Sequence, residues 1–288
     1  MTVYKRSYEA YRGKVTRRWS RCVVLTRYAL GELFRSRFFF GFFIVSLVPV
    51  LLFAGYIFVA NSPLVRTLLS LVSSSLKFPV ETRFFTSFLE AQAFLAFLLT
   101  CWAGPTLVAG DLTNGALPLF LSRPLGREEY VAGKFAVLGI LLSCITWIPA
   151  LALLFLEGGL SEKGWLAAHL WMMGPILWCS LVWIALLALV GLATSAWVKW
   201  RIVAMGAIFG VFVIPAGLGM AMDRILETGW GRMLDPNYLF HEVLYAGFRS
   251  SFGGAVPLSA AWAMLVLVSV VSLEMLRARL RAFEVVRG

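Results

Sequence analysis

The sequence predicts an all-α integral membrane protein with six transmembrane helices, from its composition, its long apolar runs and the placement of its charges. Of its 288 residues, 60% are hydrophobic and only 14% are charged, whereas soluble domains average roughly 45–50% apolar and about 25% charged residues. A soluble fold has no place for so much apolar surface, and a disordered chain would be poor in aliphatic and aromatic residues. The runs are continuously apolar, unlike the alternating strands of a membrane β-barrel.

Six stretches are long enough to be spans, because a bilayer core about 30 Å thick requires about 20 apolar residues in a helix. We predict spans over residues 38–60, 88–109, 132–156, 170–197, 202–222 and 255–276. Prolines occur within these spans at Pro49, Pro105, Pro149, Pro175 and Pro215. A proline in a lipid-buried helix is tolerated and often marks a kink or a helix end.

The net charge of +11 is distributed unevenly along the chain. If the N-terminus is cytoplasmic, 19 of the 26 Lys and Arg residues fall in cytoplasmic segments and the rest in external ones. This asymmetry predicts a multi-pass protein of the plasma (inner) membrane with both termini in the cytoplasm. The basic excess then sets topology and attracts anionic lipid of the bilayer, so we do not expect nucleic acid as a partner.

Residues 17–37 predict a basic amphipathic elbow helix before the first span. Its apolar face would carry Trp19, Cys22, Val23, Leu30, Leu33 and Phe34, and its opposite face Arg17, Arg21 and Arg35. A helix of this kind lies in the membrane interface. It could serve as a topological anchor or have a mechanical role, and the sequence leaves both interpretations open.

The loop between the second and third spans, residues 111–130, carries apolar residues outside the membrane. Asp111 could cap a helix start through its carboxylate. The apolar group consists of Leu117, Leu119, Phe120 and Leu121, and it is followed by Ser122, Arg123, Pro124 and Arg127. An exposed apolar patch flanked by charge indicates a partner, which could be the membrane surface or another protein.

This loop resembles the signature of the ABC-2 type permeases. Their pattern is an acidic residue, Gly-Thr-Leu, an apolar run, Leu-Ser-x-Pro, a basic residue, and Gly-Lys opening the next span. The matching residues are Gly115, Leu117, Leu121, Ser122, Pro124, Arg127, Gly133 and Lys134. Ala116 stands where the family usually has Thr, and Asp111 where Glu is common. The resemblance extends to the whole predicted architecture of elbow helix, six spans and two cytoplasmic ends.

The resemblance implies a single permease domain over residues 1–288, the transmembrane subunit of an ATP-binding cassette exporter. It also implies a permease homodimer, two copies of a separate ATPase subunit, and a cytoplasmic coupling helix in the loop. The candidate coupling residues are Asp111, Gly115, Leu117, Leu119, Phe120, Leu121, Ser122, Arg123, Pro124 and Arg127. No G-x-x-x-x-G-K-[ST] phosphate loop occurs in the sequence. We therefore expect no enzymatic activity and no cofactor in this chain, and ATP with Mg²⁺ on the partner ATPase.

Two features of the predicted spans, a glycine motif and an acidic residue, each allow more than one interpretation. Gly206 and Gly210 form a G-x-x-x-G motif in the fifth span, which could pack helices within the chain or form the dimer seam. The resemblance places spans one and five at that seam. Glu90, near the outer end of the second span, could serve a substrate pathway, pair two helices, or simply reach the interface.

His241 and Glu242 begin like the zinc-protease motif H-E-x-x-H, but the second His is absent and the other His of the chain is His169. Because two histidines four residues apart are needed to place two ligands on one helix face, we expect no metal site. We predict instead a short external amphipathic helix over residues 238–248, after a turn at residues 235–237.

Two other functions remain open as alternatives. A six-span membrane enzyme would require a catalytic or metal-binding constellation, and none is visible with usable spacing. A secondary transporter without an ATPase partner would favour buried ion-coupling charges and a clear internal repeat, and the sequence has few mid-membrane acids and no convincing repeat. The substrate is not indicated by any motif.

Overall fold

The computed structural model describes residues 18–65, 67, 80–113, 127–198, 200–250 and 253–282. Within these ranges the chain forms helices and turns, with no strand. Six helical segments are long and apolar enough to cross a membrane: Arg37–Asn61, Thr82–Asp111, Glu128–Leu160, Trp165–Trp197, Arg201–Leu226 and Leu258–Arg279. The predicted fold class is thereby confirmed, and each of the six predicted spans overlaps one of these segments, the second of which begins six residues before the predicted span.

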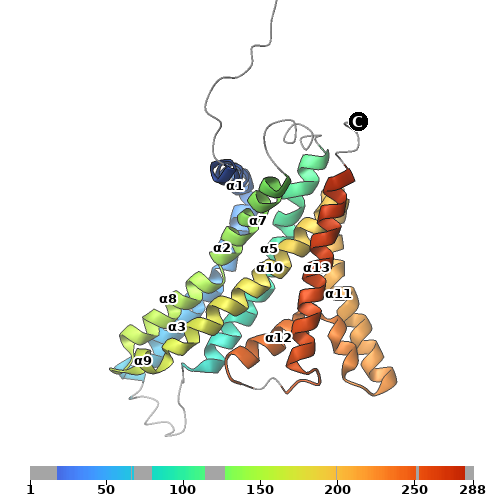
Figure 1. Ribbon diagram of the computed structural model, residues 1–288. Helices are drawn as coiled ribbons and strands as arrows, with labels where there is room; N and C mark the ends of the chain where they lie inside the picture. The colour runs from blue at the N-terminus through green and yellow to red at the C-terminus, as the bar shows by residue number, and fades with distance from the viewer. Residues whose placement is uncertain are drawn as a thin grey trace, which may run out of the picture.

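The helices follow in the order α1 (Arg18–Arg35), α2 (Arg37–Ser46), α3 (Val48–Asn61), α5 (Thr82–Thr113), α7 (Arg127–Ser143), α8 (Trp147–Leu160), α9 (Trp165–His169), η1 (Leu170–Met172), α10 (Met173–Trp197), α11 (Arg201–Leu226), η2 (Trp230–Leu234), α12 (Pro236–Gly247) and α13 (Leu258–Ala282). Figure 1 shows α1 nearly end-on at one end of the bundle and α12 at the opposite end. We call these the α1 end and the α12 end.

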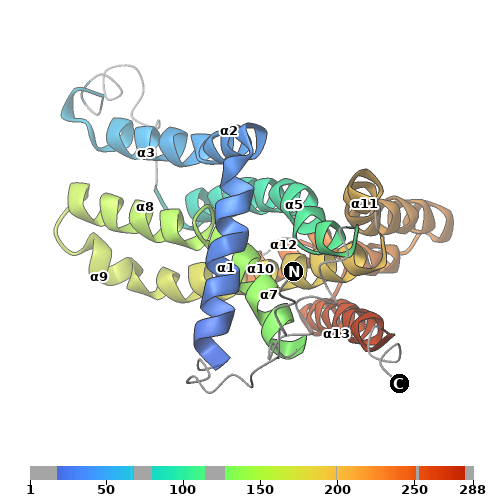
Figure 2. The same ribbon diagram turned by 90° about the horizontal axis from the view of Figure 1, so that it is seen from above.

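The helix α1 lies across the α1 end of the bundle, where it packs against α7 (Figure 2). Its buried side chains are Thr26, Ala29 and Leu33. Val23, which the sequence placed on the apolar face, is instead 64% exposed, because α7 covers only the line of residues that faces it. The predicted helix is therefore present, but its buried face is narrower than the predicted apolar face.

Two of the spans are interrupted near their middles. The first span breaks at Leu47, between α2 and α3, and the third breaks at residues 144–146, between α7 and α8. Pro49 and Pro149 each lie in the first turn after a break, where a missing backbone N–H costs nothing because that N–H would have no helical partner. By contrast, Pro105 lies inside the unbroken helix α5.

One buried glutamine on α5 lies against both breaks. In the orientation that satisfies its amide, Gln92 donates hydrogen bonds to the carbonyl oxygens of Ser46 at 3.3 Å and Ile145 at 3.2 Å. Backbone carbonyls released from a helix in the bilayer core need a partner inside the protein, since lipid offers none. The Gln92 side chain thus stabilises both interruptions from a single position.

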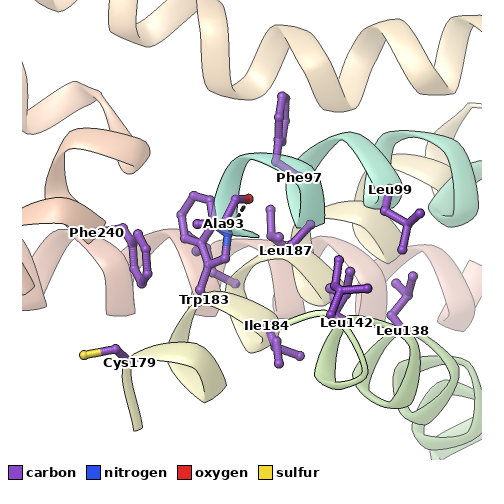
Figure 3. Close-up of a cluster of buried hydrophobic side chains, with 14 of the residues drawn as sticks. Ala93, Phe97, Leu99, Leu138, Leu142, Cys179, Trp183, Ile184, Leu187 and Phe240 are labelled. Atoms are coloured by element: carbon purple, nitrogen blue, oxygen red, sulfur yellow. Dashed lines mark hydrogen bonds between the residues drawn. The ribbon is translucent and has the colours of Figure 1, made fainter. Parts of the chain in front are cut away.

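The core is centred on α5 and α10. Trp183 of α10 is buried, stacks on Phe240 of α12 with ring centroids 4.4 Å apart, and donates its indole N–H to the Ala93 carbonyl at 3.0 Å (Figure 3). Where α10 packs against α5, a Cβ added to Gly191 would lie 2.9 Å from the Thr100 side chain. Small residues of this kind allow two membrane helices to approach closely.

The helix predicted over residues 238–248 is present as α12, and its external location stays a prediction. Asp235 caps it by accepting a hydrogen bond from the Asn237 backbone N–H at 2.9 Å, and Pro236 occupies its first turn, as expected for residues at a helix start. The helix packs against α13 and α10. It therefore closes the α12 end of the bundle with apolar side chains, among them Val243 and Leu244.

Candidate functional site

The predicted coupling loop divides between described and undescribed residues. Gly115, Leu117, Leu119, Phe120, Leu121, Ser122, Arg123 and Pro124 lie outside the described residues. Asp111 lies in the last turn of α5, and Arg127 is the first residue of α7. The structure therefore describes the two helices that carry the loop, and the coupling helix itself stays a prediction.

Asp111 joins the two helices on either side of the loop. Its carboxylate oxygen Oδ2 lies 2.8 Å from the Lys134 ammonium and accepts a hydrogen bond from the Tyr130 hydroxyl at 2.7 Å. The side chains of Lys134 and Asp111 are only 7% and 20% exposed. Charge-assisted hydrogen bonds in such surroundings are the strong ones, so the ends of α5 and α7 are held together. We call Asp111, Tyr130 and Lys134 the clamp.

The idea that Asp111 caps a helix start is wrong. Asp111 lies at the C-terminal end of α5, where the helix dipole disfavours a negative charge. Lys134 and Tyr130 offset this cost by contacting the carboxylate directly. The sequence contained one signal for this arrangement, namely Lys134 in the family signature, but the 23-residue separation concealed the pair.

The helix α1 is attached to α7 beside the clamp. The Thr26 hydroxyl donates a hydrogen bond to the Gly133 carbonyl at 3.1 Å, and Arg21 lies 3.9 Å from Glu129. A Cβ added to Gly133 would come within 2.8 Å of the Leu25 side chain, so glycine permits this close approach. The helices α1 and α5 are consequently both attached to α7.

At the α12 end, Glu90 of α5 lies beside α12. Tyr245 is hydrogen-bonded to Glu90, and burial, this hydrogen bond and the carboxylate charge all raise the tyrosine pKa. Burial lowers the pKa of His241 below its ordinary value, against the opposing effect of the Glu90 and Asp235 charges. Sequence reasoning missed these partners because they lie about 150 residues away. The contacts favour the helix-pairing interpretation of Glu90, and its use in a substrate pathway stays a prediction.

Among the described residues, no other helix approaches the glycine motif on α11 closely. A Cβ added to Gly206 would meet nothing within 4 Å among the described residues, and one added to Gly210 would meet only Ile214 of the same helix. The close approach of glycine-bearing helices instead involves α5 and α10, where a Cβ on Gly104 would lie 3.5 Å from Gly191. The face with Gly206 and Gly210 therefore remains available for a second subunit or lipid.

The comparisons with known proteins agree with this architecture. The family model described as "ABC-2 family transporter protein" matches residues 29–236, from α1 to the start of α12. The chain is also similar to the "Probable ABC transporter permease protein NosY" of Pseudomonas aeruginosa, with 29% identity over 205 residues, which are 63% of this chain and 73% of that protein. With six membrane-spanning helices and a family match over most of its length, the chain belongs to the ABC-2 family and is a membrane subunit of the ABC transporter permease type.

Proposed function

We propose that the chain is the permease subunit of an ABC exporter, in which two copies form a dimer and two separate ATPase subunits bind at the α1 end. Membership of the family implies an ATP-binding partner. The observation that carries the proposal is the clamp, which joins both helices bearing the apolar loop. The whole of residues 1–288 then acts as one transmembrane domain.

In the proposed mechanism, the ATPase pair closes and pushes on the loop, with Leu117, Leu119, Phe120 and Leu121 as the docking side chains. Because the Asp111–Lys134 ion pair joins α5 to α7, a force on the loop moves both helices together. The Thr26–Gly133 hydrogen bond passes that displacement to α1. ATP and Mg²⁺ stay on the partner, and this chain converts the motion into a change of the transport path.

The proposed orientation places the α1 end in the cytoplasm of a cell bounded by a plasma (inner) membrane. Among the described residues, most of the Lys and Arg residues belong to α1 or to the ends of other helices at the α1 end, as expected for the cytoplasmic side. Figure 1 shows α1, the first described helix, and the last turns of α13, the final described helix, at the same end of the bundle.

The proposed dimer uses the open face of α11. Gly206 and Gly210 lie one turn apart on this helix, and the most apolar stretch of α11 is only 22% buried within the chain. Exposed small residues at this spacing allow an identical helix to approach closely. A homodimer formed here would present two loops, one for each ATPase subunit.

The proposal is tested by purifying the chain together with its ATPase subunit. The variant Leu121→Asp places a charge in the proposed docking group, and we expect the amount of co-purified ATPase to fall at least tenfold, about 1.4 kcal/mol of binding free energy. Leu64→Asp is the matched control, because Leu64 is exposed beyond the outer end of α3. Normal co-purification with Leu121→Asp would refute the docking role.

A further inference from the structure

A cavity of about 190 Å³ lies at the α1 end between α1, α2, α5, α7 and α11. Its polar lining consists of Glu32, Ser36, Trp102, Thr106, Lys134 and Arg201. A water molecule takes up about 30 Å³ in the liquid, so the space could hold a polar group of several heavy atoms. None of these side chains belongs to the loop to which the proposed function assigns ATPase docking.

The cavity lies at the depth of the spans' ends. Arg201 is the first residue of α11, Ser36 separates α1 from α2, and Thr106 lies five residues before the end of the second span. Lipid headgroups occupy the zone just outside the hydrocarbon core. A cavity at this depth, between helices that face the bilayer, is therefore accessible from the headgroup region of one leaflet.

Three of the cavity's lining residues offer N–H donors. The Arg201 guanidinium lies 5.6 Å from the centre of the Trp102 ring, and no described carboxylate forms an ion pair with it. The buried Trp102 indole N–H has no acceptor among the described residues. The Lys134 ammonium has three N–H donors, and Asp111 neutralises its charge without using all of them.

Acidic and apolar groups surround these donors. Glu32, an exposed residue of α1, supplies a carboxylate to the same cavity. Two positive side chains, Lys134 and Arg201, are thus balanced by two carboxylates, Asp111 and Glu32. Because the charges cancel, the cavity favours a zwitterionic ligand over a simple anion. Phe38 on α2 and Ile202 on α11 are the sequence neighbours of the lining residues Phe39 and Arg201 and are 80% and 82% exposed, and such apolar surface suits acyl chains.

We propose that this cavity binds the headgroup of a phospholipid that carries both a phosphate and an amine. Arg201 donates to the phosphate with the planar fork that suits phosphate oxygens, while Glu32 accepts from the ammonium group. The acyl chains lie along the exposed apolar faces of α2 and α11. A lipid held here joins α1 to α11, two helices at the periphery of the chain.

The test uses the delipidated full-length permease in nonionic detergent, with lipid binding measured by native mass spectrometry. Short-chain phosphatidylethanolamine is compared with a diacylglycerol of the same chains, with phosphatidylglycerol and with inorganic phosphate. We expect phosphatidylethanolamine to bind most tightly. Arg201→Gln should weaken its binding at least about tenfold, because a charge-assisted hydrogen bond is lost, and Glu32→Gln should weaken phosphatidylethanolamine more than phosphatidylglycerol.

The control is Arg224→Gln, which removes an exposed arginine from the other end of the same helix and should leave binding unchanged. Both arginines are exposed, so melting temperatures should stay close to that of the native protein. Equal binding of diacylglycerol, or unchanged binding in Arg201→Gln, would overturn the proposal. Equally tight binding of inorganic phosphate alone would assign the cavity to a soluble anion instead. Binding of the ATPase subunit is measured separately, so failure here leaves the coupling proposal intact.

Discussion

The three inner spans and the three outer spans of the bundle differ in how much of their surface the chain itself covers. In the most apolar stretches of the second, third and fourth spans, 67%, 56% and 67% of the residues are buried. The corresponding values for the first, fifth and sixth spans are 11%, 22% and 17%. Viewed from the α1 end, α10 lies in the middle while α3, α11 and α13 lie toward the margins (Figure 2).

This difference separates what one chain can complete from what requires a second component. The inner spans are held by close helix approach at Gly191 and by stacking of Trp183 on Phe240. The outer spans present apolar side chains outward, and in a bilayer such faces are satisfied by lipid or by another membrane helix. The inner spans should therefore determine folding, and the outer spans should determine assembly.

The largest expected effect is on the inner spans. Trp183→Ala removes the ring stacked on Phe240 and the hydrogen bond to Ala93, and it should lower the free energy of unfolding by about 3–5 kcal/mol. Phe38→Ala in the first span, where the side chain is 80% exposed, should change it by less than about 0.5 kcal/mol. Reversible unfolding in detergent measures the free energy of unfolding of both variants. Similar losses in the two would refute the distinction between inner and outer spans.

The second effect concerns the clamp at the α1 end. Asp111→Ala leaves the Lys134 ammonium buried without its carboxylate, which should cost about 3 kcal/mol. Adding Lys134→Met to that variant should recover most of the loss, because no buried charge then remains. The matched control is Arg277→Ala, which breaks an exposed pair with Glu274 and should cost about 0.5 kcal/mol or less. A loss in Asp111→Ala no larger than in the control would contradict the clamp.

The third effect compares two glycines. Gly191→Val forces a side chain against Thr100 and should destabilise the inner spans by about 1–3 kcal/mol. Gly206→Val should leave unfolding unchanged, because its Cβ position is open among the described residues, yet it should lower the yield of cross-linked dimer. If the Gly206 variant dimerises normally, the seam lies elsewhere on the outer spans.

The smallest effect is a pH dependence at the α12 end. Because burial lowers the pKa of His241, the unfolded chain binds a proton more readily below about pH 6.5. The stabilising effect of the neutral imidazole is present above that pH and is lost as the pH falls toward the folded-state pKa. Between pH 8 and 5 the melting temperature should fall more in the native protein and in His169→Gln than in His241→Gln. Parallel curves for all three proteins would exclude this contribution.

The sequence predicted the spans and α12 because both depend on local composition. Twenty consecutive apolar residues must span a bilayer, and Asp235 followed by Pro236 is a local helix start. The same reasoning missed contacts that depend on folding, such as Asp111 with Lys134 and Glu90 with Tyr245.

The glycine motif illustrates the same limit. Spacing alone selected Gly206 and Gly210, whereas the close approach within the chain uses Gly104 and Gly191, which lie on different helices. No local pattern reports that two glycines far apart in sequence face each other. The loop motif likewise predicted the candidate site from local sequence, whereas the contacts of Asp111 with Tyr130 and Lys134 depend on the fold.

The central claim is that the α1 end meets the ATPase, and site-specific photocross-linking tests it most directly. A photoreactive residue replaces Phe120 in the loop or, as the control, Leu64 beyond α3, and the permease is then illuminated together with its ATPase subunit. We expect a cross-linked permease–ATPase product from position 120 and none from position 64. A product from position 64 alone, or from neither position in an assembled complex, would contradict the account.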